Sequence, residues 1–97
     1  MEAIIKGIQG IAHPIRFMIL YALMNDELSV SQLSSYTGAS QSVTSQHLGK
    51  MKESGILDNR KESNRVYYFI QDNNYKELAR IFLKMSSEQE KQARKSS

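Results

Sequence analysis

Apolar residues in the first part of the chain recur at the spacing of an α-helix. Between residues 3 and 12 they fall three or four positions apart, which places them on one helix face. His13-Pro14 then interrupts the pattern, and proline suits the first position of a helix because its missing N–H has no partner there. The segment from Pro14 through Met24 is apolar over much of its circumference. We therefore expect it to be the central helix of the core.

A sequence typical of a helix start follows a short polar break. Ser29 can accept a hydrogen bond from the amide three residues on, and Gln32 can reach back, which together make a capping box. The short helix that follows is expected to point Leu33 and Tyr36 inward. Gly38 then suits a left-handed helix end.

A second capped helix comes almost directly afterwards. Ser40 can cap it, the helix is expected to run to about Ser54, and Gly55 ends it. Two capped helices separated by a few residues that include a glycine predict a helix-turn-helix.

The pattern then changes to that of two strands and a last helix. Residues 56–61 and 66–71 are predicted strands, and the polar residues 62–65 would form the turn of a hairpin. A hairpin that follows a helix-turn-helix is called a wing. A last helix is expected over residues 73–86, and the polar tail over residues 87–97 either continues it as a fraying helix or is disordered.

The chain of 97 residues is long enough for one domain with a modest core. We therefore predict a single winged helix-turn-helix domain over residues 1–97. Its class is α+β, mainly α with a β-hairpin wing, and its expected element order is α-α-α-α-β-β-α.

The composition excludes several kinds of chemistry. The chain has no cysteine, which rules out disulfides, thiolate metal ligands and cysteine redox switches within it. No glycine-framed nucleophile, phosphate-binding loop or metal-ligand pair is found, so we expect neither an enzyme nor a cofactor. No apolar run has membrane-spanning length and no signal peptide is visible, so we expect a cytoplasmic protein without a membrane partner. The net charge of +3 permits a polyanionic partner.

The helix expected over residues 41–53 has an unusual outer face. A step of about 100° per residue separates an inner arc from an outer one. The inner arc contains Val43, Thr44, His47, Leu48 and Met51. The outer arc begins with Gln41, Ser42, Ser45 and Gln46. Glutamine can form two hydrogen bonds with an adenine edge, and serine can bond several bases. Because recognition helices contact bases through their N-terminal residues, we expect these four side chains to read DNA.

Two more residues of this helix support the same hypothesis. Gly49 removes bulk from the outer face, and Lys50 comes one turn after Gln46, where it can reach phosphate. The alternative is a solvated helix face that happens to be rich in serine and glutamine. We expect His47, on the inner arc, to be partly buried and hydrogen-bonded rather than in contact with DNA, and His13 to be a junction residue between helices.

The expected wing carries polar and basic side chains that can reach phosphate or the minor groove. They are Arg60, Lys61, Asn64 and Arg65. An ordinary hairpin also carries charges at its edges, which discourage pairing with other strands. Both interpretations can hold together.

These segments together resemble the ArsR/SmtB family of bacterial winged-helix repressors. The resemblance covers residues 8–85, and the order and spacing of the pieces are more specific than any one piece. The matching segments are Ala12-His13-Pro14-Ile15-Arg16, Glu27-Leu28-Ser29-Val30-Ser31-Gln32-Leu33, Ser40-Gln41-Ser42-Val43-Thr44-Ser45-Gln46-His47-Leu48, Gly55-Ile56-Leu57 and Val66-Tyr67-Tyr68-Phe69-Ile70. The resemblance implies a homodimer formed by the first and last helices, which represses by occupying an operator until an inducer releases it.

The apolar stripes of the helices expected over residues 3–12 and 73–86 agree with such a dimer. A domain this small has little else for them to cover. The stripe residues expected at the interface are Ile4, Ile8, Ile11, Tyr75, Leu78, Phe82 and Met85.

The chain departs from this family at the positions that sense metals. Many relatives use two cysteines of a Glu-Leu-Cys-Val-Cys motif, where this chain has Ser29 and Ser31, and neutral hydroxyls are poor ligands for soft metals. A second family site combines aspartate, two histidines and glutamate. The matching positions here are Asp72, Asn74, Met85 and Glu88. Both imidazoles are missing, and two carboxylates alone would make a weak zinc site. We therefore predict neither a metal switch nor a thiol switch.

The sequence predicts a sequence-specific DNA-binding transcriptional regulator. We expect a homodimeric repressor that binds an inverted-repeat operator in double-stranded DNA through helix 41–53 and the 56–71 wing. Its signal would be a small organic ligand, a partner protein or its own concentration. The main alternative is a winged-helix interaction module or anti-repressor that competes with another DNA-binding protein. The outer face of helix 41–53 disfavours an interaction module. Protein-interaction surfaces are rich in aromatic residues and methionine, and this face is not.

Overall fold

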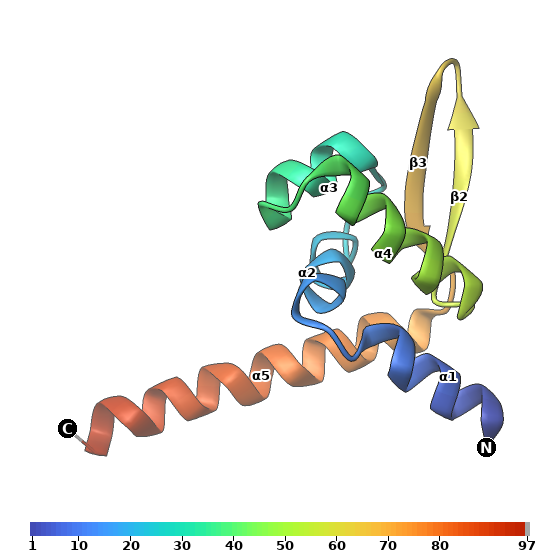
Figure 1. Ribbon diagram of the computed structural model, residues 1–97. Helices are drawn as coiled ribbons and strands as arrows, with labels where there is room; N and C mark the ends of the chain where they lie inside the picture. The colour runs from blue at the N-terminus through green and yellow to red at the C-terminus, as the bar shows by residue number, and fades with distance from the viewer. Residues whose placement is uncertain (97) are drawn as a thin grey trace.

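A computed structural model describes the backbone of residues 1–96 and the side chains of residues 1–93 (Figure 1). Within that range it contains five helices and a three-stranded antiparallel sheet. In chain order the elements are α1 (Glu2–Ile11), α2 (Pro14–Ala22), β1 (Leu28–Ser29), α3 (Val30–Thr37), α4 (Gln41–Glu53), β2 (Leu57–Glu62), β3 (Arg65–Ile70) and α5 (Asn73–Ser96). The predicted α+β class is confirmed, and one strand is added to the predicted order.

The added strand is β1, which has only two residues. Leu28 pairs with Tyr68 and Ser29 pairs with Tyr67, so the sheet has the order β1-β3-β2. The predicted order α-α-α-α-β-β-α is thus corrected to α-α-β-α-α-β-β-α. Two residues are too few to produce an alternating pattern. They become a strand only because β3 offers a free edge.

The core forms around α2, which lies at the centre of the molecule (Figure 1). Ile19 and Leu20 are fully buried, and Leu23 just beyond the helix is almost so. The other elements contribute the buried side chains Leu33, Leu48, Met51, Ile56, Leu57, Ile70 and Ala79. The prediction that this helix is central is confirmed, although it ends at Ala22 rather than Met24.

Both predicted serine caps are present. Ser29 accepts from the Gln32 amide while the Gln32 side chain accepts from the Ser29 amide, so the capping box is complete. Ser40 accepts from the Val43 amide at 3.1 Å. The prediction that Tyr36 points inward is wrong, because its side chain is exposed. Tyr36 follows the buried Leu33 by three positions, which places the two side chains about 60° apart around α3. Tyr36 therefore lies outside the side of α3 that other elements cover.

α1 packs on its own chain through glycines. Gly7 and Gly10 are its buried residues, while Ile4 and Ile8 remain exposed. A β-carbon at residue 7 would overlap the Tyr75 hydroxyl of α5. The backbone of α1 therefore lies directly against the rest of the domain. Ile4, Ile5 and Ile8 are left exposed, whereas Ile11 packs against the core.

α5 is longer than the sequence predicted. It begins at the expected residue, Asn73, but continues past 86 to Ser96. Residues 87–96 of the expected polar tail are thus helical, and residue 97 lies outside the described residues. In Figure 1 this part of α5 extends away from the rest of the molecule.

No single helix within residues 1–96 is long and apolar enough to cross a membrane. α1 and α2 together pass that test on length and composition, but a bend of 92° separates them.

Candidate nucleic-acid interface

α4 has one fully buried face and one exposed face. Thr44, Leu48 and Met51 are completely buried against the core. The opposite face leaves the five predicted DNA-contacting side chains exposed. They are Gln41, Ser42, Ser45, Gln46 and Lys50. The structure thus brings all five to one solvent-facing surface of one helix.

The predicted inner arc is partly wrong. Val43 was expected to face the core, but it is 39% exposed. The buried residues centre on Thr44, which lies about 100° around the helix from Val43. The neighbouring elements α2, α3 and β2 decide which arc of α4 is covered. A helical wheel is drawn from the sequence of α4 alone and therefore cannot place these neighbours.

Gly49 lies on the open side of α4. A β-carbon built there would meet no atom within 4 Å, so the fold itself does not require glycine at this position. Gly55 differs, because its φ of +81° is a left-handed conformation that favours glycine and it follows the end of α4. The space beside Gly49 is therefore available to a partner of α4.

His47 is partly buried and hydrogen-bonded, as predicted. Its Nδ1 accepts from Nε of Arg16 on α2 at 3.1 Å. Its ring centroid lies 4.4 Å from that of His13. Burial lowers the pKa of His47 below its ordinary value, and the nearby His13 and Arg16 lower it further. His13 itself caps α2, where its Nδ1 accepts from the Ile15 amide, so its expected place at a helix junction is confirmed.

The wing ends in a two-residue turn between Glu62 and Arg65, which pair with each other. Ser63 in this turn has a φ of +55°. Three of the four predicted wing residues are exposed at or near this tip. They are Lys61, Asn64 and Arg65. Figure 1 shows that the wing projects from the body beside α4.

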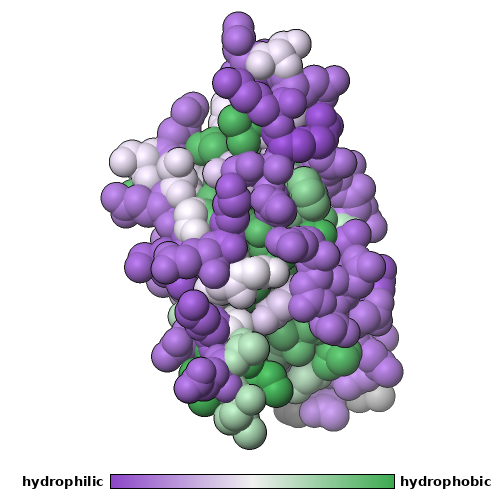
Figure 2. Space-filling model, turned by 90° about the vertical axis from the view of Figure 1, so that its right-hand side faces the viewer, coloured by the Kyte–Doolittle hydropathy of each residue, from purple (hydrophilic) through white to green (hydrophobic). Residues whose placement is uncertain are grey.

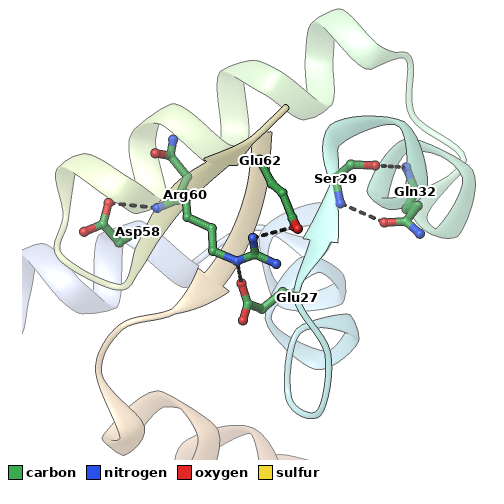
Figure 3. Close-up of polar contacts among 7 residues, drawn as sticks. Glu27, Ser29, Gln32, Asp58, Arg60 and Glu62 are labelled. Carbon is green, nitrogen blue, oxygen red and sulfur yellow. Dashed lines mark hydrogen bonds and ion pairs between the residues drawn. The ribbon is translucent and has the colours of Figure 1, made fainter. Parts of the chain in front are cut away.

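Arg60 is placed differently from the other wing residues. Its guanidinium donates to carboxylate oxygens of Glu27 and Glu62, the latter at 2.8 Å (Figure 3). It also lies 5.0 Å from the centroid of the Tyr67 ring. Hydrogen bonds to Glu62 and Glu27 raise its pKa above the usual range. Arg60 therefore connects the wing to the segment before β1, and its charge is already paired.

The predicted dimer residues lie on α1 and α5 with much of their surface uncovered. Ile4 is 61% exposed, Ile8 57%, Phe82 42% and Met85 47%, and the rest of the set, Ile11, Tyr75 and Leu78, is half-buried. Figure 2 shows hydrophobic side chains at the lower end of the molecule, where α1 lies, below a mostly hydrophilic wing. Ile5 of α1 and Ile81 of α5 are also exposed, and they were not among the predicted dimer residues. Ile5 lies three positions before Ile8, and Ile81 lies three positions after Leu78 and four before Met85. This helical spacing is the signal that could have found them.

The positions that match the family's metal sites hold other interactions. Ser29 is the cap of α3, and Ser31 is exposed beside it. A carboxylate oxygen of Asp72 accepts from the amide of Asn74 at the start of α5. Within the part of the chain that the structure describes, no three His, Asp or Glu side chains lie close enough together to hold a metal ion.

Comparison with known proteins decides the family. The sequence model for bacterial regulatory proteins of the arsR family matches residues 13–59, which span α2 through α4 and the start of the wing. The biofilm growth-associated repressor of Xylella fastidiosa is 31% identical over 86 residues, which are 89% of this chain and 75% of that protein. The chain belongs to the ArsR family.

Solved structures of similar proteins share this fold. HlyU from Vibrio cholerae superposes with a TM-score of 0.81 at 31% identity, covering 87% of this chain and 91% of that one. By sequence the same organism's transcriptional activator HlyU is 35% identical over 76% of this chain and 68% of its own length. A homodimeric winged helix-turn-helix DNA-binding domain from Mycobacterium bovis has a TM-score of 0.82 at 24% identity, covering 91% and 82% of the two chains.

The chain is therefore a DNA-binding transcriptional regulator and not an enzyme. The winged helix-turn-helix that the sequence predicted is confirmed.

Proposed function

We propose that this regulator is a homodimeric repressor that binds an inverted-repeat operator through α4 and the tip of the wing. The observation that carries the proposal is the division of α4 into two faces. One face is locked into the core by fully buried side chains, and the other presents uncharged hydrogen-bonding groups to solvent. A helix held in this way can enter the major groove with a fixed orientation.

In this proposal Gln41 and Gln46 form the base contacts that distinguish sequences, since a glutamine amide can bond adenine at two points. Ser42 and Ser45, with shorter side chains, add further hydrogen bonds to the bases. Lys50 reaches phosphate from the next turn. The bases are thus read by the N-terminal half of α4.

The wing contributes mainly to binding of the DNA backbone. Lys61, Asn64 and Arg65 are exposed near its tip and can reach phosphate or the minor groove. We assign Arg60 a smaller part in DNA contact than its sequence position suggested, because Glu27 and Glu62 already pair with it. Its main contribution would be to hold the wing at a fixed angle to the body.

A dimer would cover the apolar surface of α1 and α5. Apolar area is costly to leave in water, and patches of this kind often mark protein interfaces. The structural relative from Mycobacterium bovis is homodimeric. Two α4 helices in a symmetric dimer would address half-sites about 34–36 Å apart, one turn of DNA.

We propose that neither a metal nor a thiol controls the protein. Serine hydroxyls occupy the positions of the family's cysteine ligands, and the chain has no cysteine. We propose repression as the sign of regulation, as in the name of the Xylella fastidiosa repressor, although the relative HlyU is named an activator. The same proposal includes a cytoplasmic location and a small-molecule or protein effector.

The test is a selection of bound sequences from random DNA, carried out in buffer, with micromolar zinc and with a chelator. We expect one inverted-repeat motif with half-sites one helical turn apart, recovered equally in all three arms. A single half-site, together with a monomer in light scattering, would contradict the dimer. Release of DNA in the zinc arm alone would contradict the metal-independent assignment. Ile8→Glu is the matched variant, because it places a charge on the exposed apolar surface away from the core, and it is expected to give a folded monomer.

A further inference from the structure

A polar link joins α4 to α1 through α2. Arg16 of α2 donates from Nε to Nδ1 of His47 on α4 and from Nη1 to the carbonyl oxygen of Gln9 on α1, both at 3.1 Å. One guanidinium thus connects the helix that faces DNA with the helix that carries the apolar surface. The ring of His13 lies beside the His47 ring.

This link requires a neutral His47. Arginine has donors and no acceptor, so the Nδ1 atom that it contacts must be without a proton. The imidazole proton is then on Nε2. Protonation of His47 would turn Nδ1 into a donor facing another donor, and the hydrogen bond to Arg16 would be lost.

We propose that Arg16 is a positioning residue for α4. Protonation of His47 breaks its hydrogen bond to Arg16, so affinity for operator DNA falls as the pH falls. This inference rests on the proposed function, in which α4 reads DNA. A recognition helix must be held to within about 0.5 Å and 10–20° of its productive geometry. Loss of the link would therefore weaken specific binding more than it weakens binding to random DNA.

The surroundings of His47 favour this direction of change. From α2 it faces His13 and Arg16, the two groups whose charge acts on it. α3 carries no charged residue, and the Asp58 and Arg60 charges of β2 are paired with Lys52 and with Glu27 and Glu62. The charged residues of α1, Glu2 and Lys6, are exposed, and within α4 itself Lys50 lies one turn away. A positive charge on His47 would thus lie closest to basic groups, which repel it.

General electrostatics predict the opposite result. Added positive charge on a DNA-binding protein strengthens its attraction to phosphate. The sign of the pH dependence consequently distinguishes a positioning role from simple charge attraction.

The experiment measures affinity at pH 7.5 and pH 5.5 for a DNA sequence selected by the wild-type protein at pH 7.5. We expect the wild type to bind more weakly at the lower pH, by less than about tenfold, because the lowered pKa of His47 leaves part of this group neutral at pH 5.5. His47→Asn keeps an acceptor near the position of Nδ1 and does not titrate. It should bind at pH 7.5 within about threefold of wild type and keep that affinity at pH 5.5. Circular dichroism at both values of pH checks that each protein is folded.

Two further variants locate the effect. His13→Asn keeps a side chain that can cap α2 and removes the neighbouring ring, so it should retain the loss of affinity at low pH. Arg16→Lys keeps the charge but not the planar pair of donors. It should bind weakly already at pH 7.5, with little further change at pH 5.5.

An NMR titration tests the link without DNA. The His47 imidazole should be the Nε2–H tautomer, and its titration midpoint should rise in Arg16→Met, because a nearby cation is removed. Retention of the low-pH loss by His47→Asn, or an affinity that rises on acidification of the wild type, would overturn the inference. Failure to select any DNA at pH 7.5 would instead overturn the proposed function, and the NMR titration would still report on the link.

Discussion

The backbone of Gly10 on α1 lies against the fully buried side chain of Ile56. A β-carbon added at residue 10 would lie 2.7 Å from Cδ1 of Ile56 and 2.9 Å from Oγ of Ser54. This contact sets how closely α1 approaches the end of α4 and the start of β2. It also fixes which side of α1 is left facing outward, with Ile4 and Ile8 on it.

Gly10→Ala is expected to lower the free energy of unfolding. Overpacking of a tight site costs about 1–3 kcal/mol, and the higher helix propensity of alanine returns roughly 1 kcal/mol of it. Urea denaturation measures the net loss. The control is Gly49→Ala, which adds the same methyl group in a helix with open space around it and should raise stability by about 0.5–1 kcal/mol. Equal effects of the two substitutions would mean that α1 does not pack as described.

Gly49→Ala should weaken DNA binding although it stabilises the fold. The added methyl group projects from the exposed face of α4, where the proposed interface needs close approach of the backbone to DNA. Affinity for the selected operator, measured by fluorescence anisotropy, should fall while thermal stability rises. An unchanged affinity would show that DNA does not approach α4 at this position.

Gln46→Ala should reduce affinity for the operator by about 1–3 kcal/mol and broaden the set of sequences that are bound. The reason is the loss of two hydrogen bonds to one base edge. Selection of bound sequences from random DNA is repeated with the variant. It should show a relaxed base preference at one position of each half-site. Gln89→Ala on the exposed part of α5 is the control and should behave as wild type. A Gln46→Ala motif identical to that of wild type would remove this residue from the reading set.

The two arginines of the wing should respond differently to substitution. Arg65→Ala should weaken binding to all sequences and reduce the slope of log affinity against log salt by about 1, because one phosphate contact is lost. Arg60→Ala should change that slope less, since its charge is already paired with Glu27 and Glu62. Titrations at four salt concentrations separate the two cases. A larger change of slope for Arg60→Ala than for Arg65→Ala would reverse the assignment.

The lowered pKa of His47 predicts how stability depends on pH. The folded protein keeps this group neutral below its ordinary pKa of 6.5, where the unfolded chain binds a proton. The unfolded state therefore holds more protons, and the free energy of unfolding decreases as the pH falls from 6.5 toward the lowered pKa. Below that pKa the contribution no longer changes. Urea denaturation between pH 5 and pH 8 should show this decrease in the wild type and a smaller one in His47→Asn.

The sequence by itself determined the local structure, because local structure depends on neighbours in the chain. The Ser29 capping box, the Ser40 cap and the proline at the start of α2 were each predicted from a few adjacent residues and are confirmed. The hairpin of β2 and β3 was predicted in the same way from its alternating and polar positions. The resemblance to the ArsR family also came from short segments in a fixed order, and the comparisons confirm it.

The tertiary structure decided what depends on residues far apart in the chain. β1 exists because Leu28 meets Tyr68, forty positions later, and no local pattern contains that pairing. Val43 and Tyr36 are exposed because other elements cover only part of α4 and α3. Arg60 was expected to reach phosphate or the minor groove, and only the tertiary structure shows that its guanidinium is paired with Glu27 from another segment. The contact of Arg16 with His47 joins residues 31 positions apart, and only the packing of α2 on α4 brings it about.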